Sequence, residues 1–194
     1  MRRMIKPLIF LVALVPLAFV VVKVIQNDLG PDPAQELAKL TGIWALRFLI
    51  LALALTPLRL MTNQAEFVRN RRMLGLFAWF YATVHFMVWM TFLLEFQWGR
   101  IAAEIIERPF ITVGFCSYVI LLALAVTSPK FMVRKLGRNW KRLHKLVYVA
   151  AILAVIHLLW ILRTDVGEAV LYGGLVAILL GYRAFHKYRR SVPR

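Results

Sequence analysis

A histidine interrupts a long apolar run in Trp79-Phe80-Tyr81-Ala82-Thr83-Val84-His85-Phe86, and a second one does so in Ala154-Val155-Ile156-His157-Leu158. An α-helix needs about 20 apolar residues to cross the hydrocarbon core of a bilayer. Both runs meet this requirement, and they predict membrane spans over residues 73–96 and 144–163. Because an ionisable side chain inside a span is costly, each histidine is a candidate functional residue.

The rest of the chain has the same membrane character. Of its 194 residues, 61% are hydrophobic, whereas soluble domains average about 45–50%. Four further apolar runs predict spans over residues 8–26, 41–60, 109–128 and 167–187, and no internal repeat stands out. We therefore expect an all-α membrane protein in which residues 1–194 form a single transmembrane domain, a six-transmembrane-helix bundle surrounded by membrane lipid.

The distribution of charge gives the expected orientation. The chain carries 25 lysines and arginines against 9 acidic residues, for a net charge of +16. In a soluble protein this excess would indicate nucleic-acid binding, but here most basic residues lie between spans on one side. The positive-inside rule therefore predicts a multi-pass protein of the bacterial inner membrane, with both termini cytoplasmic and no nucleic-acid partner. The longest outer connection, residues 27–40, is expected to be a linker or a short helix on the membrane surface.

His85 and His157 are expected at matching depths in the membrane. His85 lies 13 residues beyond Arg72, and His157 lies 12 beyond Lys145, which places both about 18–20 Å from the cytoplasmic edge at about 1.5 Å per residue. Their spans run in the same direction, so the two imidazoles can hold a haem iron from opposite faces. Alanines before each histidine leave room for a flat macrocycle. Alternatively, the histidines hydrogen-bond between helices, and the alanines only mediate helix packing.

A second level of candidate ligands lies nearer the cytoplasm. Arg71 precedes His85 by 14 residues, a spacing that returns to nearly the same face of a helix. His144 precedes His157 by 13 residues, a spacing that misses the face by about 140°. The two residues are candidates for a second haem site. Alternatively, His144 lies at the lipid headgroups. For Arg71, a charge that only sets the topology is favoured over a ligand. His186, in the basic C-terminal tail, receives no role.

Two arginines near the outer ends of their spans are candidate partners for haem carboxylates. Arg47 lies in the second span and Arg163 at the end of the fifth. A guanidinium fork suits a carboxylate such as a haem propionate, although long basic side chains near helix ends also extend to the headgroups. A single cysteine, Cys116, excludes a multi-cysteine metal site. The chain also lacks Cys-x-x-Cys-His for covalent haem attachment and a G-x-G-x-x-G nucleotide fingerprint.

Five segments together resemble a known family, and the resemblance covers essentially the whole chain. They are Arg71-Arg72-Met73-Leu74-Gly75-Leu76, Tyr81-Ala82-Thr83-Val84-His85-Phe86, Ile106-Glu107-Arg108-Pro109-Phe110-Ile111-Thr112-Val113-Gly114, Leu121-Leu122-Ala123-Leu124-Ala125-Val126-Thr127-Ser128 and Asn139-Trp140-Lys141-Arg142-Leu143-His144-Lys145-Leu146-Val147-Tyr148. The parallel histidine-bearing spans resemble the ferric-reductase-like transmembrane domain, in which histidines on two helices hold stacked haems. The segments are more similar still to the MsrQ (YedZ) family of haem-binding membrane subunits. The chain departs from the four-histidine pattern by having Arg71 at the fourth position.

The resemblance implies a function in membrane electron transfer. Such subunits bind haem b, one or two per chain, through the positions of His85, His144 and His157, and FMN is also attributed to them. They pass electrons, ascribed to the quinone pool, to MsrP, a periplasmic molybdoenzyme that reduces methionine sulfoxide in envelope proteins. We therefore expect an electron-transfer subunit of an oxidoreductase system rather than its catalytic subunit.

Two rival functions remain open. One is a ferric- or oxygen-reducing transmembrane reductase that receives electrons from a soluble flavin reductase. The other belongs to a different class, a non-redox membrane carrier or structural protein whose histidines only bond one helix to another.

Overall fold

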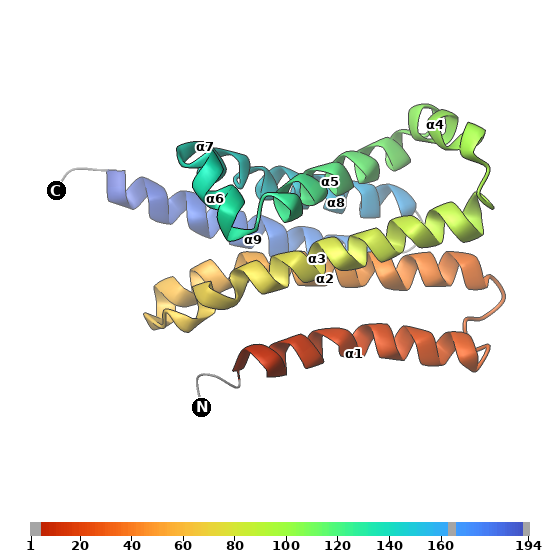
Figure 1. Cartoon of the computed structure of the whole chain (residues 1–194), viewed down its shortest axis with the longest axis horizontal. Coiled ribbons are helices and arrows are strands. Elements are labelled where there is room, and N and C mark those ends of the chain that lie inside the picture. The colour runs from red at the N-terminus through yellow and green to blue at the C-terminus, as the bar shows by residue number, and fades with distance from the viewer. Residues whose placement is uncertain (1–4, 163–165, 192–194) are drawn as a thin grey trace.

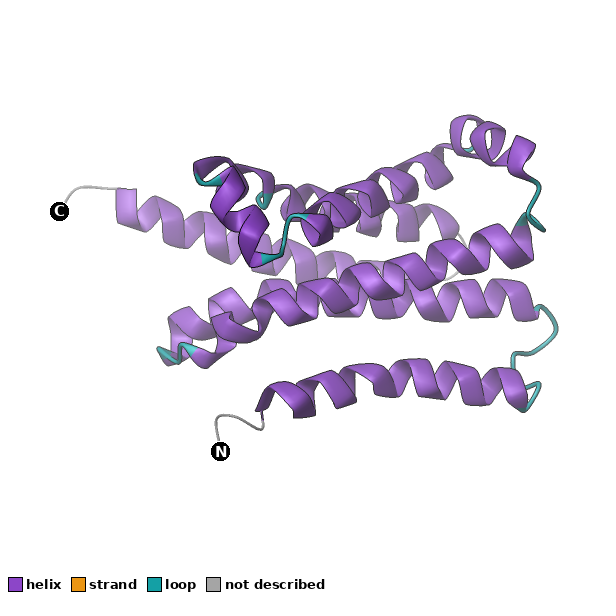
Figure 2. Cartoon of the chain, in the orientation of Figure 1, coloured by secondary structure: helices purple, strands orange, loops and turns teal. Residues whose placement is uncertain are grey.

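The computed structural model describes residues 5–162 and 166–191, and these residues form helices joined by short turns (Figure 2). The elements are α1 (Ile5–Ile25), α2 (Pro33–Thr62), α3 (Glu66–Val88), the π-helix η1 (Trp89–Leu93), α4 (Trp98–Glu107), α5 (Pro109–Val126), α6 (Lys130–Leu136), α7 (Arg138–Leu143), α8 (Leu146–Ile161) and α9 (Val166–Ser191). The prediction of an all-α protein is confirmed.

Within the described ranges, six segments are long and apolar enough to cross a membrane. They are Ile5–Ile25, Pro33–Thr62, Glu66–Leu93, Pro109–Val126, Arg138–Ile161 and Val166–Arg189, so the predicted number of spans is confirmed. α1 begins and α9 ends at the same end of the bundle, which we call the inner end (Figure 1). We call the opposite end, where α4 lies, the outer end.

The outer end differs from the prediction in two places. Of the expected connection over residues 27–40, residues 27–32 are a turn, whereas residues 33–40 are the first turns of α2, which starts with Pro33. Asp32 caps this start, because its Oδ1 accepts a hydrogen bond from the backbone N–H of Gln35 at 3.1 Å. The connection between the third and fourth spans also contains an amphipathic helix, α4. Both changes bring charged residues over the outer end of the bundle.

Two antiparallel helix pairs, α2 with α3 and α5 with α8, form the centre of the bundle. Ala78 of α3 and Ala150 of α8 are completely buried. Ser117 Oγ of α5 donates a hydrogen bond of 2.9 Å to the carbonyl of Ala150. Small side chains let helices approach closely in lipid, where apolar burial gives little driving force. The centre therefore holds the two histidine-bearing helices, α3 and α8, in fixed positions.

Tyr81 of α3 attaches α1 to this centre. Its side chain is 1% exposed, and its hydroxyl donates to the carbonyl of Ala13 at 2.8 Å while accepting from the N–H of Leu17 at 3.1 Å. Those two backbone groups would bond to each other in an uninterrupted helix. Tyr81 therefore inserts into the hydrogen-bond ladder of α1 beside Pro16, where proline has already weakened it.

Candidate functional site

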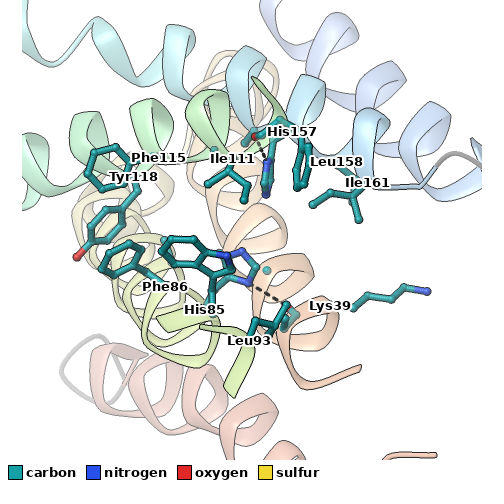
Figure 3. Close-up of a pocket in the computed structure, with 18 of the residues that line it drawn as sticks. Lys39, His85, Phe86, Leu93, Ile111, Phe115, Tyr118, His157, Leu158 and Ile161 are labelled. Carbon is teal, nitrogen blue, oxygen red and sulfur yellow. Dashed lines mark hydrogen bonds between the residues drawn. The ribbon is translucent and has the colours of Figure 1, made fainter. Parts of the chain in front are cut away.

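His85 of α3 and His157 of α8 face each other near the outer end of the bundle (Figure 3). Their ring centroids are 6.2 Å apart, and the ring planes cross at 76°. The structure thus brings together the two residues that the sequence places at one depth. Ala82 and Ala154, one turn before each histidine, line the same cavity as the rings.

Each histidine ring is held through its Nδ1 by a backbone carbonyl of a neighbouring helix. His85 Nδ1 lies 2.8 Å from the carbonyl oxygen of Ala38 on α2, and His157 Nδ1 lies 2.6 Å from that of Phe110 on α5. Because a carbonyl oxygen only accepts, Nδ1 must carry the proton in both rings. This leaves each Nε2 with a lone pair for a metal, the arrangement usual for histidine ligands.

The distance between the rings fits a metal bound between them. A metal–imidazole bond is about 2 Å long, so two imidazoles on opposite sides of one metal have ring centres about 6 Å apart. Within the described residues, there is no cluster of three or more histidine, cysteine or acidic side chains that would complete a purely protein site. Two opposed imidazoles alone suit a metal whose remaining positions are filled by a macrocycle, as in haem.

The two rings project into a cavity of about 910 Å³, at the upper end of the usual range for cofactor pockets, about 300–1,000 Å³. Its walls are largely apolar and aromatic, and they include Phe86, Phe115 and Tyr118, whose side chains are visible in Figure 3. The π-helix η1 follows α3 at Trp89 and also contributes to the wall. π-helical turns often occur at functional sites. The cavity therefore has the size and the apolar character that a flat macrocycle needs.

Six charged residues also line the cavity, three of each sign: Asp32, Glu36, Lys39, Arg100, Glu104 and Arg108. Glu104 of α4 is paired with Arg108 at 2.7 Å and with Arg100 at 3.5 Å. Lys39 of α2 lies 3.7 Å from Glu168 of α9. These cations were not predicted, because the sequence places both of their segments in connections outside the spans.

Of the two arginines predicted as partners of haem carboxylates, the structure describes Arg47 alone. Arg47 does not line the cavity. Its Nε instead donates a hydrogen bond of 2.7 Å to the hydroxyl of Tyr172 on α9. Its guanidinium also lies over the ring of Trp44, 4.7 Å from the centroid. Arg47 therefore joins α2 to α9. Arg163 lies outside the residues that the structure describes.

The candidates for a second haem site lie toward the inner end, away from the cavity. His144 stacks on Trp140 with ring centroids 4.0 Å apart, and its Nε2 lies 3.2 Å from Thr127 Oγ1. α7 ends at Leu143, so His144 sits in a break before α8 and the helical spacing from His157 does not apply. Arg71 Nη1 lies 3.5 Å from Thr56 Oγ1. The guanidinium of Arg71 is also close enough to His144 to interact with it electrostatically.

Arg183 of α9 is a further inner residue that the sequence analysis did not single out. It donates to the hydroxyl of Tyr148 at 2.8 Å and to the carbonyl of Leu53. That carbonyl lacks its helical partner because the residue four positions later is Pro57, which has no N–H. Arg183 therefore satisfies a backbone group that proline leaves unpaired and joins α2, α8 and α9.

The two halves of the site repeat each other along the chain. Each histidine lies 47 residues after the carbonyl that holds it. His85, Gly42 and Pro57 recur 72 residues later as His157, Gly114 and Pro129, and alanines 78 and 82 recur as alanines 150 and 154. No repeat stands out from the hydropathy of the chain, but this recurrence of single residues at an offset of 72 is a sequence signal that could have identified α2 and α5 as the helices holding the histidines.

Comparison with known proteins agrees with this arrangement. Residues 41–155 match the family model described as ferric reductase like transmembrane component. The chain is 48% identical over 174 residues to the "Protein-methionine-sulfoxide reductase heme-binding subunit MsrQ" of Xanthomonas oryzae pv. oryzae (strain MAFF 311018), a match that covers 86% of this chain and 80% of the relative. It is 41% identical over 192 residues to the MsrQ subunit of Polaromonas naphthalenivorans (strain CJ2), covering 97% of this chain and 88% of the relative. No solved structure matches. The chain therefore belongs to the ferric-reductase-like transmembrane family and, within it, to the MsrQ subunits.

Proposed function

We propose that this chain is a haem-binding electron-transfer subunit of a membrane oxidoreductase system. The proposal rests on the opposed pair of His85 and His157. Their ring centroids are 6.2 Å apart, and a backbone carbonyl holds the Nδ1 atom of each ring. The relatives are named as haem-binding subunits of protein-methionine-sulfoxide reductase, which supports the same assignment. A haem held in this way supplies one-electron transfer and leaves the iron without an open position for substrate.

The residues of the chain divide the work of holding the haem. His85 and His157 bind the iron through Nε2, and the carbonyls of Ala38 and Phe110 orient the rings. The apolar walls exclude water from the macrocycle. Lys39, Arg100 and Arg108 are the cations in the wall, so they are the proposed partners of the haem carboxylates in place of Arg47.

We propose that the chain binds a single haem b. His144 stacks on Trp140, and its Nε2 is engaged by the hydroxyl of Thr127. A second haem at the inner end is therefore left out. The relatives' names mention haem and not FMN, so the proposal carries haem alone.

The direction of transfer follows from the position of the site and the charge of the chain. The cavity lies near the outer end, which the positive-inside rule places on the periplasmic side of the bacterial inner membrane. We propose that an MsrP-like periplasmic molybdoenzyme, the catalytic subunit, docks there and takes the electrons. The proposed donor is quinone in the membrane, because the regular elements of the described residues are all helices and offer no sheet for a nucleotide.

Electron delivery can be tested with the purified protein, loaded with haem during expression. Its haem is reduced by a quinol, mixed with an MsrP-like enzyme, and followed by visible absorbance under anaerobic conditions. We expect the haem to be reoxidised only when both that enzyme and methionine sulfoxide are present. Reduction by a soluble flavin reductase but not by quinol, with reoxidation by ferric iron alone, would instead support a ferric-type reductase.

A further inference from the structure

Two glycines lie directly against the two histidine rings. A Cβ at Gly42 of α2 would stand 3.1 Å from Nδ1 and Cε1 of His85. A Cβ at Gly114 of α5 would stand only 2.7 Å from the same two atoms of His157. Real Cβ atoms essentially never approach as closely as 2.7 Å, so an alanine at position 114 would have to displace the ring.

Each of these glycines lies one helical turn after the carbonyl that holds the ring. Gly42 follows Ala38 by four residues, and Gly114 follows Phe110 by four residues. Residues four apart lie one above the other on a helix. Each helix therefore presents a notch to its histidine, made of one accepting carbonyl and the bare backbone of a glycine.

We propose that these two notches, Ala38 with Gly42 and Phe110 with Gly114, fix the rotation of the two imidazoles so that their planes stand crossed. This inference rests on the proposed haem site and names Gly42 and Gly114 as its positioning residues. The hydrogen bond alone fixes where Nδ1 lies but lets the ring swing about that contact. The glycine surface beside Nδ1 and Cε1 sets the swing, because the ring edge rests directly against it.

Three other glycines of the long helices leave an added Cβ in open space, and a fourth, Gly173 of α9, would meet only Val155, at 3.3 Å. Gly75 of α3 and Gly174 and Gly181 of α9 have no atom within 4 Å of an added Cβ. An alanine at these positions would meet no other atom, whereas the space beside Gly42 and Gly114 is filled by a histidine ring. Alanine favours a helix over glycine by about 0.5–1 kcal/mol, so glycine at positions 42 and 114 runs against local helix preference.

Ring rotation has an electronic consequence that can be measured. The π system of each imidazole interacts with one of the two iron d orbitals that extend out of the macrocycle plane. When the two imidazole planes are crossed, the two d orbitals are affected equally and stay nearly degenerate. The ferric low-spin haem then gives a strongly anisotropic EPR spectrum dominated by one large g value. Parallel planes separate the orbitals and give an ordinary rhombic spectrum. The 76° crossing angle predicts the first kind of spectrum.

The test compares the EPR spectra and midpoint potentials of Gly114→Ala and Gly42→Ala with those of the wild type. Gly75→Ala and Gly174→Ala are matched controls, because they add the same methyl group to a helix where it meets nothing. We expect the large-g signal in the wild type and both controls. It should be lost or shifted toward a rhombic spectrum in Gly114→Ala, with a smaller shift in Gly42→Ala because its contact is looser. The midpoint potential should move in the same order.

The outcomes separate this inference from the proposed function. A folded wild type that binds no haem would refute both. Haem-replete Gly114→Ala and Gly42→Ala with spectra identical to the controls would refute the positioning role while leaving the haem site intact. If Gly114→Ala does not fold, the milder Gly42→Ala variant decides, and its unchanged spectrum would overturn the inference.

Discussion

Replacing Tyr81 by phenylalanine should loosen α1 without disturbing the haem site. The ring would keep its stacking on Phe48, whose centroid is 5.1 Å away. The hydroxyl would be lost, and with it the bonds to the Ala13 carbonyl and the Leu17 N–H. Hydrogen bonds between membrane helices average about 0.6 kcal/mol each, so we expect two of them to contribute about 1 kcal/mol.

That loss is measurable as a change in melting temperature. For domains of 150–250 residues, about 1 kcal/mol corresponds to about 2–4 °C, so Tyr81→Phe should melt that much lower in mild detergent. Tyr182→Phe is the control, because its ring stacks on His186 and its hydroxyl makes no hydrogen bond within residues 5–162 and 166–191. Equal melting temperatures for the two variants would show that Tyr81 does not hold α1 in this way.

Three further predictions concern the inner end and the orientation. Arg183→Met should lower the melting temperature, and the loss should shrink in a Pro57→Ala background, because residue 57 can then donate to the Leu53 carbonyl; additive losses would contradict this role. His144→Ala should leave haem content and spectrum unchanged, since His144 is engaged by Trp140 and Thr127; a halved haem content would reveal an inner haem. In a Cys116→Ser background, a membrane-impermeant maleimide should label Asn27→Cys in intact cells and Asn63→Cys only after lysis; the reverse pattern would invert the topology.

The sequence predicts the spans well because the requirement for about 20 apolar residues is a strong and local constraint. It also pairs His85 with His157, because depth in a membrane is a simple function of residue number in a helix. The 13-residue spacing places His144 off the face of His157, and in the structure His144 lies between α7 and α8 and does not line the cavity. Because α7 ends at Leu143, helical spacing from His157 cannot give the exact direction of this side chain.

The supporting residues were missed because they belong to other helices. Gly42 and Gly114 act through contacts with residues far away in the sequence, which hydropathy does not report. Lys39 and Arg100 were read as parts of connections, yet α2 begins earlier than its apolar run and α4 is short and amphipathic. The recurrence of glycine, proline and histidine after 72 residues is the one pattern in the sequence that relates the two halves of the site.

The most direct test of the central claim is the reduced-minus-oxidised visible spectrum of the purified protein, with haem quantified in the same samples. The variants His85→Ala and His157→Ala are compared with His186→Ala, whose ring stacks on Tyr182 away from the cavity wall. We predict a low-spin b-type spectrum and a single haem in the wild type and His186→Ala, and loss of that spectrum in both of the other variants. A folded but colourless wild type, or a haem spectrum that survives in both His85→Ala and His157→Ala, would contradict the account.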